Sequence, residues 1–238
     1  MSLDLDRLRA AFRGRSLEYY PTLDSTMTVA AARPLGTIVV ADEQTSGRGR
    51  HGHSWHSEPG AGIYVSLVLQ PGPVLTLALG LATAEAIATV TGLACDLRWP
   101  NDVMIGGRKV AGILVELVNG LAIGGIGINV NQTAFPSSLA HEATSLRLQA
   151  GSEFSRTAIL MSLVRAIETF QSFDKESILR LFTQASSYAA GRRVTVAQPE
   201  GKVEGVTAGL DASGYLVLRR DDGTDTLILA GGVRAAGS

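Results

Sequence analysis

The feature that most constrains the fold is a glycine- and arginine-rich segment set between two apolar stretches. Residues 42–69 read DEQTSGRGRHGHSWHSEPGAGIYVSLVL. An apolar strand is expected over residues 37–41 before it, and every second residue from Ile63 to Leu69 is apolar after it, as in a half-buried strand. Glycines let the backbone pass close to a ligand, and arginines supply paired donors for phosphate or carboxylate. We therefore expect a flexible cationic loop that captures and encloses a small anionic ligand.

Other interpretations of this loop are weaker or stay open. It lacks the Gly-Lys-Ser/Thr ending of a P-loop, and a strand follows it where a dinucleotide-binding fingerprint requires a helix. A mobile surface loop with solvated charges remains an alternative. Beyond the loop histidines His51, His53 and His56, the chain has His141 alone, so the pattern argues against a zinc site. Trp55 is either a core residue or a stacking platform for a base.

Composition limits the class of protein. The chain has 238 residues, of which 45% are hydrophobic, enough to build one large domain or one domain with a small appendage. A formal net charge of −1 argues against a general nucleic-acid binder, and the single cysteine, Cys95, allows no intramolecular disulfide. The first residues lack the apolar core of a signal peptide, and the longest apolar helix is too short to span a bilayer. We expect a soluble, cytoplasmic protein with no membrane partner.

Hydrophobic periodicity predicts a first domain of strands and helices over residues 1–186. The expected helices cover residues 5–12, 75–92, 159–170 and 177–185. The expected strands cover residues 16–20, 37–41, 63–69, 94–98, 103–105, 110–117 and 121–130, and a polar loop follows over residues 131–151. Glycines inside the last of these strands (LAIGGIGINVN) indicate close approach of a ligand or of another backbone.

Two short segments place polar groups at the ends of expected strands. Asp24-Ser25-Thr26 is a strand-to-helix junction, where Asp24 or Ser25 is either only an N-cap or part of a site for a polar ligand group. Trp99-Pro100-Asn101-Asp102 makes a sharp corner, which is either a plain turn or a ligand contact through its amide and carboxylate.

A lysine stands at the start of the strand that follows this corner. Lys109 precedes Ala111 and Gly112, whose small size would let a substrate lie against the backbone. A solvent-facing lysine on an edge strand is the alternative, and spacing alone does not decide between them.

A second, smaller unit begins near residue 187. Short strands are expected at residues 193–196, 203–210, 215–218 and 226–229, with turns between them. Such a unit makes a small barrel or sandwich that needs the surface of the first domain for stability. The predicted domains are therefore residues 1–186 and 187–238.

Five motifs taken in order resemble those of the biotin–protein ligases: EQTSGRGRHGHSW, RWPNDV, GRKVAGILVE, GIGINVN and ATSL. Each is weak alone, but the ordered set is specific and covers Thr22 to about Leu146. The resemblance implies an α+β fold, a mixed β-sheet flanked by helices (class II synthetase/biotin ligase-like) followed by a small C-terminal SH3-like β-barrel. It also implies that biotin and ATP give biotinyl-5′-AMP, with Mg²⁺ on the phosphates. The biotinyl group would then pass to a lysine of a biotin carboxyl carrier protein or domain of a biotin-dependent carboxylase.

The resemblance assigns roles to individual residues. The expected catalytic residues are Lys109, Arg50 and Asp102, of which Asp102 would orient or deprotonate the acceptor lysine. The expected biotin contacts are Ser25, Thr26, Gln44, Arg48, Gly49, Arg50, Lys109 and Gly112. The expected ATP or adenylate contacts are Arg48, Arg50, Trp55, Asn101, Lys109 and Asn129, with Trp55 stacking on adenine. No residue is assigned as a metal ligand.

The sequence also departs from the family. Met27 stands where Asn is usual, and His51 and His53 stand where Arg is common, so one biotin contact and the charge of the loop differ. About twenty residues precede the matching region, so we expect a monofunctional enzyme without a DNA-binding domain and with no nucleic-acid partner. An exposed strand of the main sheet is a candidate surface for a homodimer.

Two other functions compete with biotin ligation. A lipoate or octanoate–protein ligase of the same fold is one, which the GRGRxG loop and the order of the later motifs disfavour. A non-catalytic module that binds biotin or a nucleotide is the other. Arg50, Asp102 and Lys109 together argue against it, because binding alone does not require both cations at a reacting phosphate.

Overall fold

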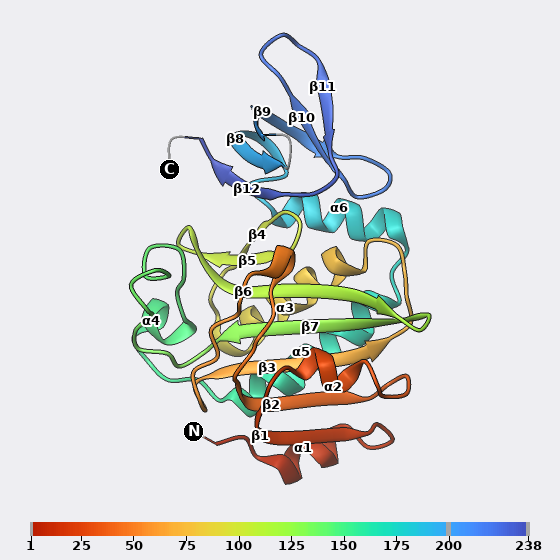
Figure 1. Ribbon diagram of the computed structural model, residues 1–238, viewed down its shortest axis with the longest axis vertical. Coiled ribbons are helices and arrows are strands. Elements are labelled where there is room, and N and C mark those ends of the chain that lie inside the picture. The colour runs from red at the N-terminus through yellow and green to blue at the C-terminus, as the bar shows by residue number, and fades with distance from the viewer. Residues whose placement is uncertain (1, 199–200, 237–238) are drawn as a thin grey trace.

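A seven-stranded mixed β-sheet organises the larger part of the molecule (Figure 1). The structure is a computed structural model that describes residues 2–198 and 201–236. In spatial order, the strands of this sheet among the described residues are β1 (Leu17–Leu23), β2 (Ile38–Gln44), β3 (Gly62–Leu69), β7 (Leu121–Asn129), β6 (Arg108–Val118), β5 (Asp102–Ile105) and β4 (Asp96–Arg98). β1 and β2 run parallel, and the other neighbouring pairs run antiparallel. The mixed sheet expected from the sequence is confirmed.

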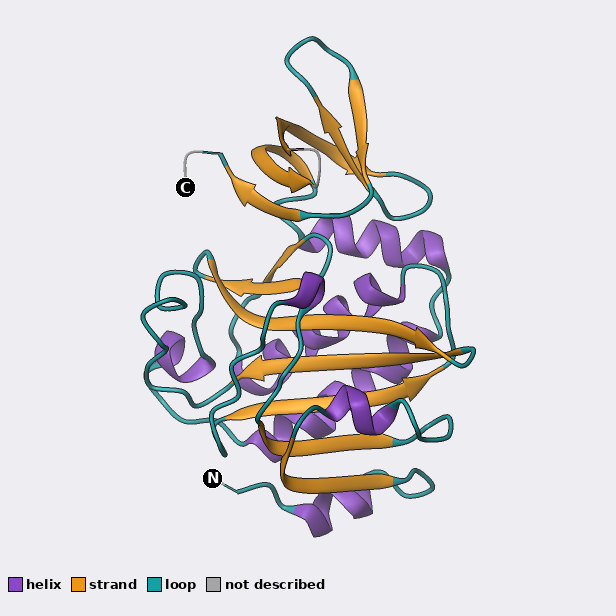
Figure 2. Ribbon diagram, in the orientation of Figure 1, coloured by secondary structure: helices purple, strands orange, loops and turns teal. Residues whose placement is uncertain are grey.

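Helices cover the two faces of the sheet unequally (Figure 2). One face packs against α3 (Leu75–Thr91) and α5 (Arg156–Gln171), with α1 (Leu5–Ala11) beside α5 and α6 (Lys175–Ala185) beside α3. The opposite face carries α2 (Thr26–Ala30) and the predicted cationic loop, which contains the 3-10 turn η1 (Arg50–Gly52). This unequal cover leaves the middle of the second face to the loop.

The main core lies between the sheet and α3. This helix is buried along most of its length and on nearly all sides, as expected of an apolar helix enclosed by a sheet and by other helices. It ends at Gly92, whose left-handed backbone (φ 72°) suits a glycine and whose N–H donates to Ala88 O (2.8 Å). Gly92 is therefore the C-cap of α3.

A second sheet forms the C-terminal part of the described chain (Figure 1). Its strands are β8 (Ala190–Gln198), β9 (Gly201–Leu210), β10 (Leu216–Arg219), β11 (Asp225–Ile228) and β12 (Gly232–Ala235), in the antiparallel order β11-β10-β9-β8-β12. Trp99 joins the two sheets, because its indole N–H donates to Gly214 O (2.9 Å). The small β unit is confirmed. The predicted boundary at residues 186 and 187 falls between α6 and β8 and stays a prediction.

Some short elements differ from the prediction. The strand expected from residue 94 begins at Asp96, α4 (Leu146–Ala150) lies inside the expected polar loop, and β12 was not expected. Elements of four or five residues contain too few apolar repeats for periodicity to reveal them. None of the helices in the described part of the chain is long and apolar enough to cross a membrane.

Candidate active site

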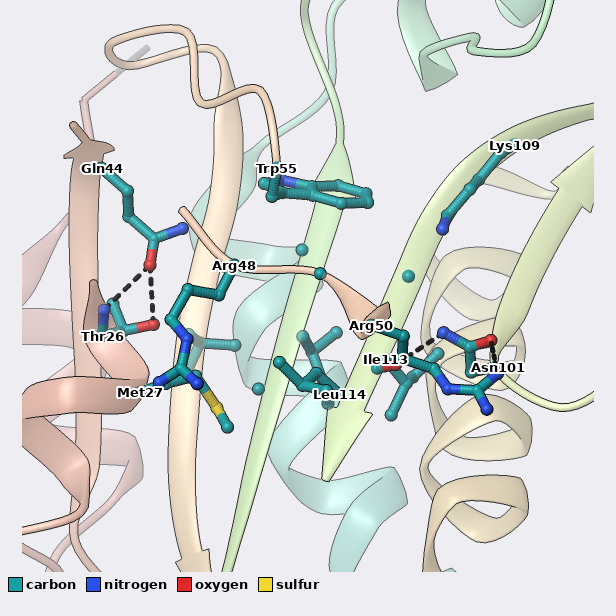
Figure 3. A pocket seen from close by; sticks show the side chains of 16 residues that line it. Thr26, Met27, Gln44, Arg48, Arg50, Trp55, Asn101, Lys109, Ile113 and Leu114 are labelled. Atoms are coloured by element: carbon teal, nitrogen blue, oxygen red, sulfur yellow. Dashed lines mark hydrogen bonds between the residues drawn. The ribbon is translucent and has the colours of Figure 1, made fainter. Parts of the chain in front are cut away.

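Three glycines stand on the sheet face opposite α3. Gly112 on β6 pairs with Gly127 on β7, and Gly125 precedes Gly127 by two residues on the same face. A methyl group at Gly125 would overlap the thioether of Met27, and one at Gly112 or Gly127 would overlap the indole of Trp55. The glycines therefore let these two side chains rest on the backbone of the sheet (Figure 3).

A β-bulge turns Lys109 toward this same face. Val103 and Met104 are consecutive on β5, but their partners on β6 are Ala111 and Lys109. At this point β6 therefore holds one extra residue, Val110. In a regular strand, Lys109 and Gly112 would point to opposite faces of the sheet. The bulge brings them to one face, and the Lys109 Nζ lies 2.9 Å from the place that a Cβ on Gly112 would occupy.

The ATSL segment fixes the backbone of Lys109. The Lys109 N–H donates to Glu142 O (2.7 Å), and Lys109 O accepts from the Thr144 N–H (2.9 Å), around a parallel bridge to Ala143. The Asn129 side-chain amide donates to Thr144 O (3.0 Å). This segment, distant in sequence, therefore positions both the lysine and the asparagine that the motifs single out.

An inner cavity lies between α2, the loop and the three glycines (Figure 3). The described residues that line it are Thr26, Met27, Gln44, Arg48, Gly49, Arg50, Trp55, Val65, Asn101, Lys109, Gly112, Ile113, Leu114, Gly125, Ile126 and Gly127. At one end, Gln44 Oε1 accepts from the Thr26 N–H (2.8 Å) and hydroxyl (3.0 Å), and Ser66 donates to Thr26 Oγ1 (2.8 Å). The cavity measures about 50 Å³. Typical ligand pockets reach about 300 Å³ or more, so the loop that covers this cavity must move before a ligand enters.

Ser25 is the N-cap residue of α2, but its side chain does not cap the helix. Its N–H donates to Asp24 Oδ1 (2.7 Å), but its own hydroxyl makes no capping bond and is buried without a hydrogen-bond partner among the described residues. Ser25 lines neither of the cavities described in this section. A buried hydroxyl without a partner is destabilising, so a ligand group that reached it would be stabilised. The N-cap position expected at this junction is confirmed for Ser25, although without a side-chain capping bond, and the ligand role stays a prediction.

A larger, outer cavity of about 660 Å³ lies where the loop, the corner at residues 99–102 and the C-terminal sheet meet. Its volume is within the range of small-molecule sites. Its walls include His51, His53, Ser54, His56, Arg98, Trp99, Pro100, Asp102, Asn129, Leu139, Glu142 and Ala143 from the first sheet and its loops, and Ala197, Gln198, Ala230, Gly231, Gly232, Val233 and Arg234 from the second. The Arg234 guanidinium donates to Glu142 Oε1 (2.7 Å) across its rim, where both side chains are exposed.

The two cavities meet at a shared wall, which we call the junction. Among the described residues, the junction consists of Gly49, Arg50, Trp55, Asn101 and Lys109. Lys109 Nζ lies over the indole of Trp55, 5.3 Å from the ring centroid. Two cations and an aromatic ring therefore stand where a ligand in one cavity would touch a ligand in the other.

Arg50 is held at the junction by the corner residue Asn101. Its Nη1 donates to Asn101 Oδ1 (3.2 Å), and the Asn101 amide donates to Ile113 O (2.8 Å) on β6. Burial lowers the pKa of Arg50, an effect that the charge of Asp102 opposes. The guanidinium keeps its proton at any working pH, so it presents a partly desolvated positive charge to the cavities.

Asp102 is held by two cations. Its Oδ1 lies 2.5 Å from Lys109 Nζ, and its Oδ2 accepts from Arg98 Nε (3.1 Å) and Nη2 (2.7 Å). Burial alone raises the pKa of Asp102, but Lys109 and Arg98 outweigh burial and leave the pKa below its usual range. A carboxylate so stabilised in its ionised form is a weak base. Of the two roles expected for Asp102, the geometry favours orienting the acceptor lysine.

Arg48 has a partner that the sequence did not reveal. Its Nη2 donates to Glu116 Oε1 (2.8 Å) on β6, and both side chains are partly exposed. Pairs of this kind stabilise by less than about 1 kcal/mol. Because Arg48 also lines the inner cavity, a ligand there can replace Glu116 as the partner of Arg48 at little cost in free energy.

The stem of the loop is tied to α5 by a buried ion pair. Arg156, whose side chain is 1% exposed, donates from Nη1 to Asp42 Oδ1 (2.7 Å) and to Gly62 O (3.2 Å). Tyr19 donates to Asp42 Oδ2 (2.7 Å), and the Gly60 N–H donates to Asp42 O (3.1 Å). The two ends of the segment from residue 42 to residue 62 are thus joined, while the tip around η1 is not part of these bonds.

The structure brings nearly all of the expected site residues together. Thr26, Gln44, Arg48 and Gly112 line the inner cavity, Asp102 and Asn129 line the outer cavity, and Gly49, Arg50, Trp55, Asn101 and Lys109 line both. Sequence reasoning missed Arg98 and Glu116. The first had a usable signal, because a strand, a three-residue corner and a second strand place Arg98 opposite Asp102.

Comparison with known proteins decides the family. Residues 19–132 match the biotin/lipoate A/B protein ligase family, and residues 190–233 match the biotin protein ligase C-terminal domain. The bifunctional ligase/repressor BirA of Bacillus subtilis is 34% identical over 238 residues, which cover 91% of this chain and 73% of that protein. The chain belongs to the biotin protein ligases.

Further members of the biotin protein ligases support this assignment. The biotin–[acetyl-CoA-carboxylase] ligase of Mycobacterium tuberculosis is 33% identical over 210 residues, which cover 83% of this chain and 77% of that protein. The biotin protein ligase of Aquifex aeolicus, solved in complex with biotin and ATP, superposes with a TM-score of 0.83 at 33% identity. That match covers 93% of this chain and 99% of the Aquifex chain, so both sheets belong to the common fold.

Proposed function

We propose that this biotin protein ligase joins biotin to ATP, giving biotinyl-5′-AMP and pyrophosphate, and then transfers the biotinyl group to a lysine of a biotin carboxyl carrier protein. The observation that carries the proposal is the junction. It sets Lys109 and Arg50 between the small inner cavity and the large outer one. Biotin occupies the inner cavity, and ATP occupies the outer one.

Electrostatics explains why both cations are needed. In the first step, a carboxylate oxygen of biotin attacks the α-phosphorus of ATP, and the bond to pyrophosphate breaks. Two unit negative charges about 4 Å apart repel each other by about 4 kcal/mol at an effective dielectric of 20. Lys109 and Arg50, at the boundary of the two cavities, reduce this repulsion and stabilise the charge that develops on the phosphate oxygens.

The far end of the inner cavity suits the polar ring of biotin. Thr26 and Gln44 form a hydrogen-bonded pair there, and the hydroxyl of the adjacent Ser25 has no hydrogen-bond partner in the described part of the chain. A cyclic urea carries one acceptor and two donors, which such hydroxyl and amide groups complement. Gly112 lets Lys109 and Trp55 lie against the backbone of β6 beside this cavity.

The nucleotide lies in the outer cavity with its adenine on Trp55. The indole carries a buried N–H without a hydrogen-bond partner among the described residues, and its position on the sheet leaves an aromatic wall for stacking. Mg²⁺ arrives on the phosphates. The described residues contain no group of three or more His, Cys, Asp or Glu side chains that could hold a metal ion, so the phosphates of ATP would supply its ligands.

In the second step, the ε-amine of the acceptor lysine attacks the carbonyl carbon of the mixed anhydride, and AMP leaves. The acceptor lysine enters through the outer cavity, where Asp102 accepts a hydrogen bond from its neutral ε-amine, and the proton lost from nitrogen as the amide forms passes to the phosphate of the leaving AMP. The loop keeps water from the anhydride between the two steps.

We also place the enzyme in the cytoplasm, and we assign it no nucleic-acid partner. The free edge of β1 is the candidate surface for a homodimer.

One assay tests the proposal. Purified protein is incubated with a carrier domain, Mg·ATP and biotin, and both pyrophosphate release and the mass of the carrier are measured. We expect both products to require biotin and ATP. Transfer of lipoate or octanoate at an equal rate would point to the related acyl ligases, and tight binding of biotin without pyrophosphate release would point to a binding module.

A further inference from the structure

Asp102 divides its two oxygens between cations on two different strands. Oδ1 contacts Lys109 on β6, and Oδ2 accepts two N–H bonds from Arg98 on β4. The side chains of Asp102, Arg98 and Lys109 are only 15%, 20% and 28% exposed. We propose that Arg98 is a positioning residue, which holds the Asp102 carboxylate when Lys109 leaves it for the anionic groups of the substrates. This inference rests on the proposed function.

The two cations differ in how freely they can move. Arg98 stands directly across the β4–β5 ladder from Asp102, and its planar guanidinium grips one oxygen with two donors. Lys109 has a flexible four-carbon stem and a single contact to this carboxylate. Its Nζ already lies at the junction, over Trp55. Lys109 can therefore exchange partners, while Arg98 stays with Asp102.

Charge explains why the exchange needs Arg98. The titratable groups that face Asp102 are Arg98 on β4, Lys109 on β6 and Arg50 in the loop. If Lys109 were the only close partner of Asp102, its departure would leave a mostly buried carboxylate without a countercharge. That cost in free energy would keep Lys109 bound to Asp102. With Arg98 in place, Asp102 stays paired and ionised throughout. Lys109 then becomes available to the biotin carboxylate and the α-phosphate.

Two other roles for Arg98 make different predictions. Arg98 also lines the outer cavity. If it bound the phosphates directly, its replacement would raise the KM for ATP. If it only braced the β4–β5 hairpin, its loss would lower the melting temperature and leave the pH dependence of the reaction unchanged. The proposal instead requires an effect on kcat and on pH dependence that is transmitted through Asp102.

The experiment measures biotin-dependent exchange of pyrophosphate into ATP, from pH 3 to pH 9, for wild type, Arg98→Gln and Arg98→Lys. For Arg98→Gln we expect kcat to fall about tenfold, with the KM for ATP changed less than about threefold. Losing one nearby cation raises the pKa of a carboxylate by about one unit or more, so the acid limb should move up by about one pH unit. Arg98→Lys keeps the charge and should restore the acid limb, with part of kcat.

A double variant tests whether Arg98 acts through Asp102. In an Asp102→Asn background, Arg98→Gln should change kcat by less than about twofold, because the group that it positions is gone. A full additional loss in that background would overturn the proposal and favour direct phosphate contact. An unshifted acid limb in Arg98→Gln would also overturn it, and this result does not depend on how slow the double variant is.

One arm needs no activity. The Asp102 carboxyl is titrated by NMR in protein with ¹³C-labelled aspartate, and its signal is assigned with Asp102→Asn. Arg98→Gln should raise its pKa, whereas Arg33→Gln should not, although Arg33 pairs with Glu18 through a short, more exposed contact (2.6 Å) away from both cavities. If wild type shows no biotin-dependent exchange, the proposed function fails. If the pKa of Asp102 is the same in Arg98→Gln as in wild type, the positioning role of Arg98 fails while the proposed function stands.

Discussion

Trp55 lies so close to Gly127 that a methyl group on the glycine would overlap the indole ring. The contact joins the loop to the middle of β7, and it sets the ring as a partition between the inner and outer cavities. A partition of this kind links the two binding events, since a ligand on either side touches the same side chain.

Replacing Trp55 with Ala should therefore weaken ATP binding more than biotin binding. Stacking of a base on an aromatic side chain contributes about 1–3 kcal/mol, so we expect the Kd for ATP to rise between about 5-fold and about 100-fold. Trp55→Phe keeps a stacking surface and should show a smaller change. Calorimetry with each ligand alone gives the comparison, and a larger loss for biotin would remove the stacking role.

Replacing Lys109 with Ala should abolish most of the first step while leaving the fold intact. Removing a preorganised donor to a developing negative charge typically lowers kcat by about 10²- to 10³-fold. Biotin-dependent pyrophosphate release measures this step, and circular dichroism checks the fold. The matched control is Lys175→Ala, on the surface helix α6, which should behave as wild type. Unchanged turnover of Lys109→Ala would exclude this lysine from the chemistry.

Replacing Arg50 with Gly should let the biotinyl adenylate escape. The guanidinium and Asn101 together bind the tip of the loop to the corner at the end of β4, and glycine removes that bond and adds flexibility. We expect faster loss of labelled intermediate during rapid gel filtration. Arg48→Gly, on the same loop but paired with Glu116 at the surface, should lose less. If Arg50→Gly and wild type retain the adenylate equally, Arg50 does not hold the loop closed over it.

Much of the site could be predicted because its residues cluster in short motifs at strand ends. The loop, the corner at residues 99–102 and the strand after Lys109 all lie where the sequence placed them. The bulge in β6 could not be predicted, because register depends on pairing with β5 and β7 rather than on local pattern. The contact between Arg48 and Glu116 likewise joins residues that only the folded sheet brings together.

Replacing Arg156 with Met should destabilise the whole first domain. It removes a cation that is 1% exposed from Asp42, and breaking such a pair costs about 3 kcal/mol or more. Denaturant unfolding measures the loss. Arg147→Met breaks an exposed pair with Glu153 and should change the free energy of unfolding by less than about 1 kcal/mol. Similar values for the two variants would show that burial of the Arg156 pair is not decisive.

The thiol of Cys95 should be inert in the native protein. Burial raises its pKa to about 12, so almost no thiolate exists at pH 8. We expect iodoacetamide to label it slowly in the folded protein and quickly in urea. The sign of the linkage follows: the folded state favours the protonated thiol, so its contribution to stability is complete below about pH 8 and declines as the pH rises toward 12. Rapid native labelling would show that the thiol is accessible.

The outer cavity draws its walls from widely separated parts of the chain, with Gly49 in the loop and Arg234 on β12. During translation, the loop, the corner and the lysine leave the ribosome long before β12 does. A nascent chain that stops short of this strand possesses every residue of the proposed chemistry but lacks one side of the nucleotide compartment. Nucleotide affinity should therefore arise late in synthesis, once the small sheet has folded against the large one.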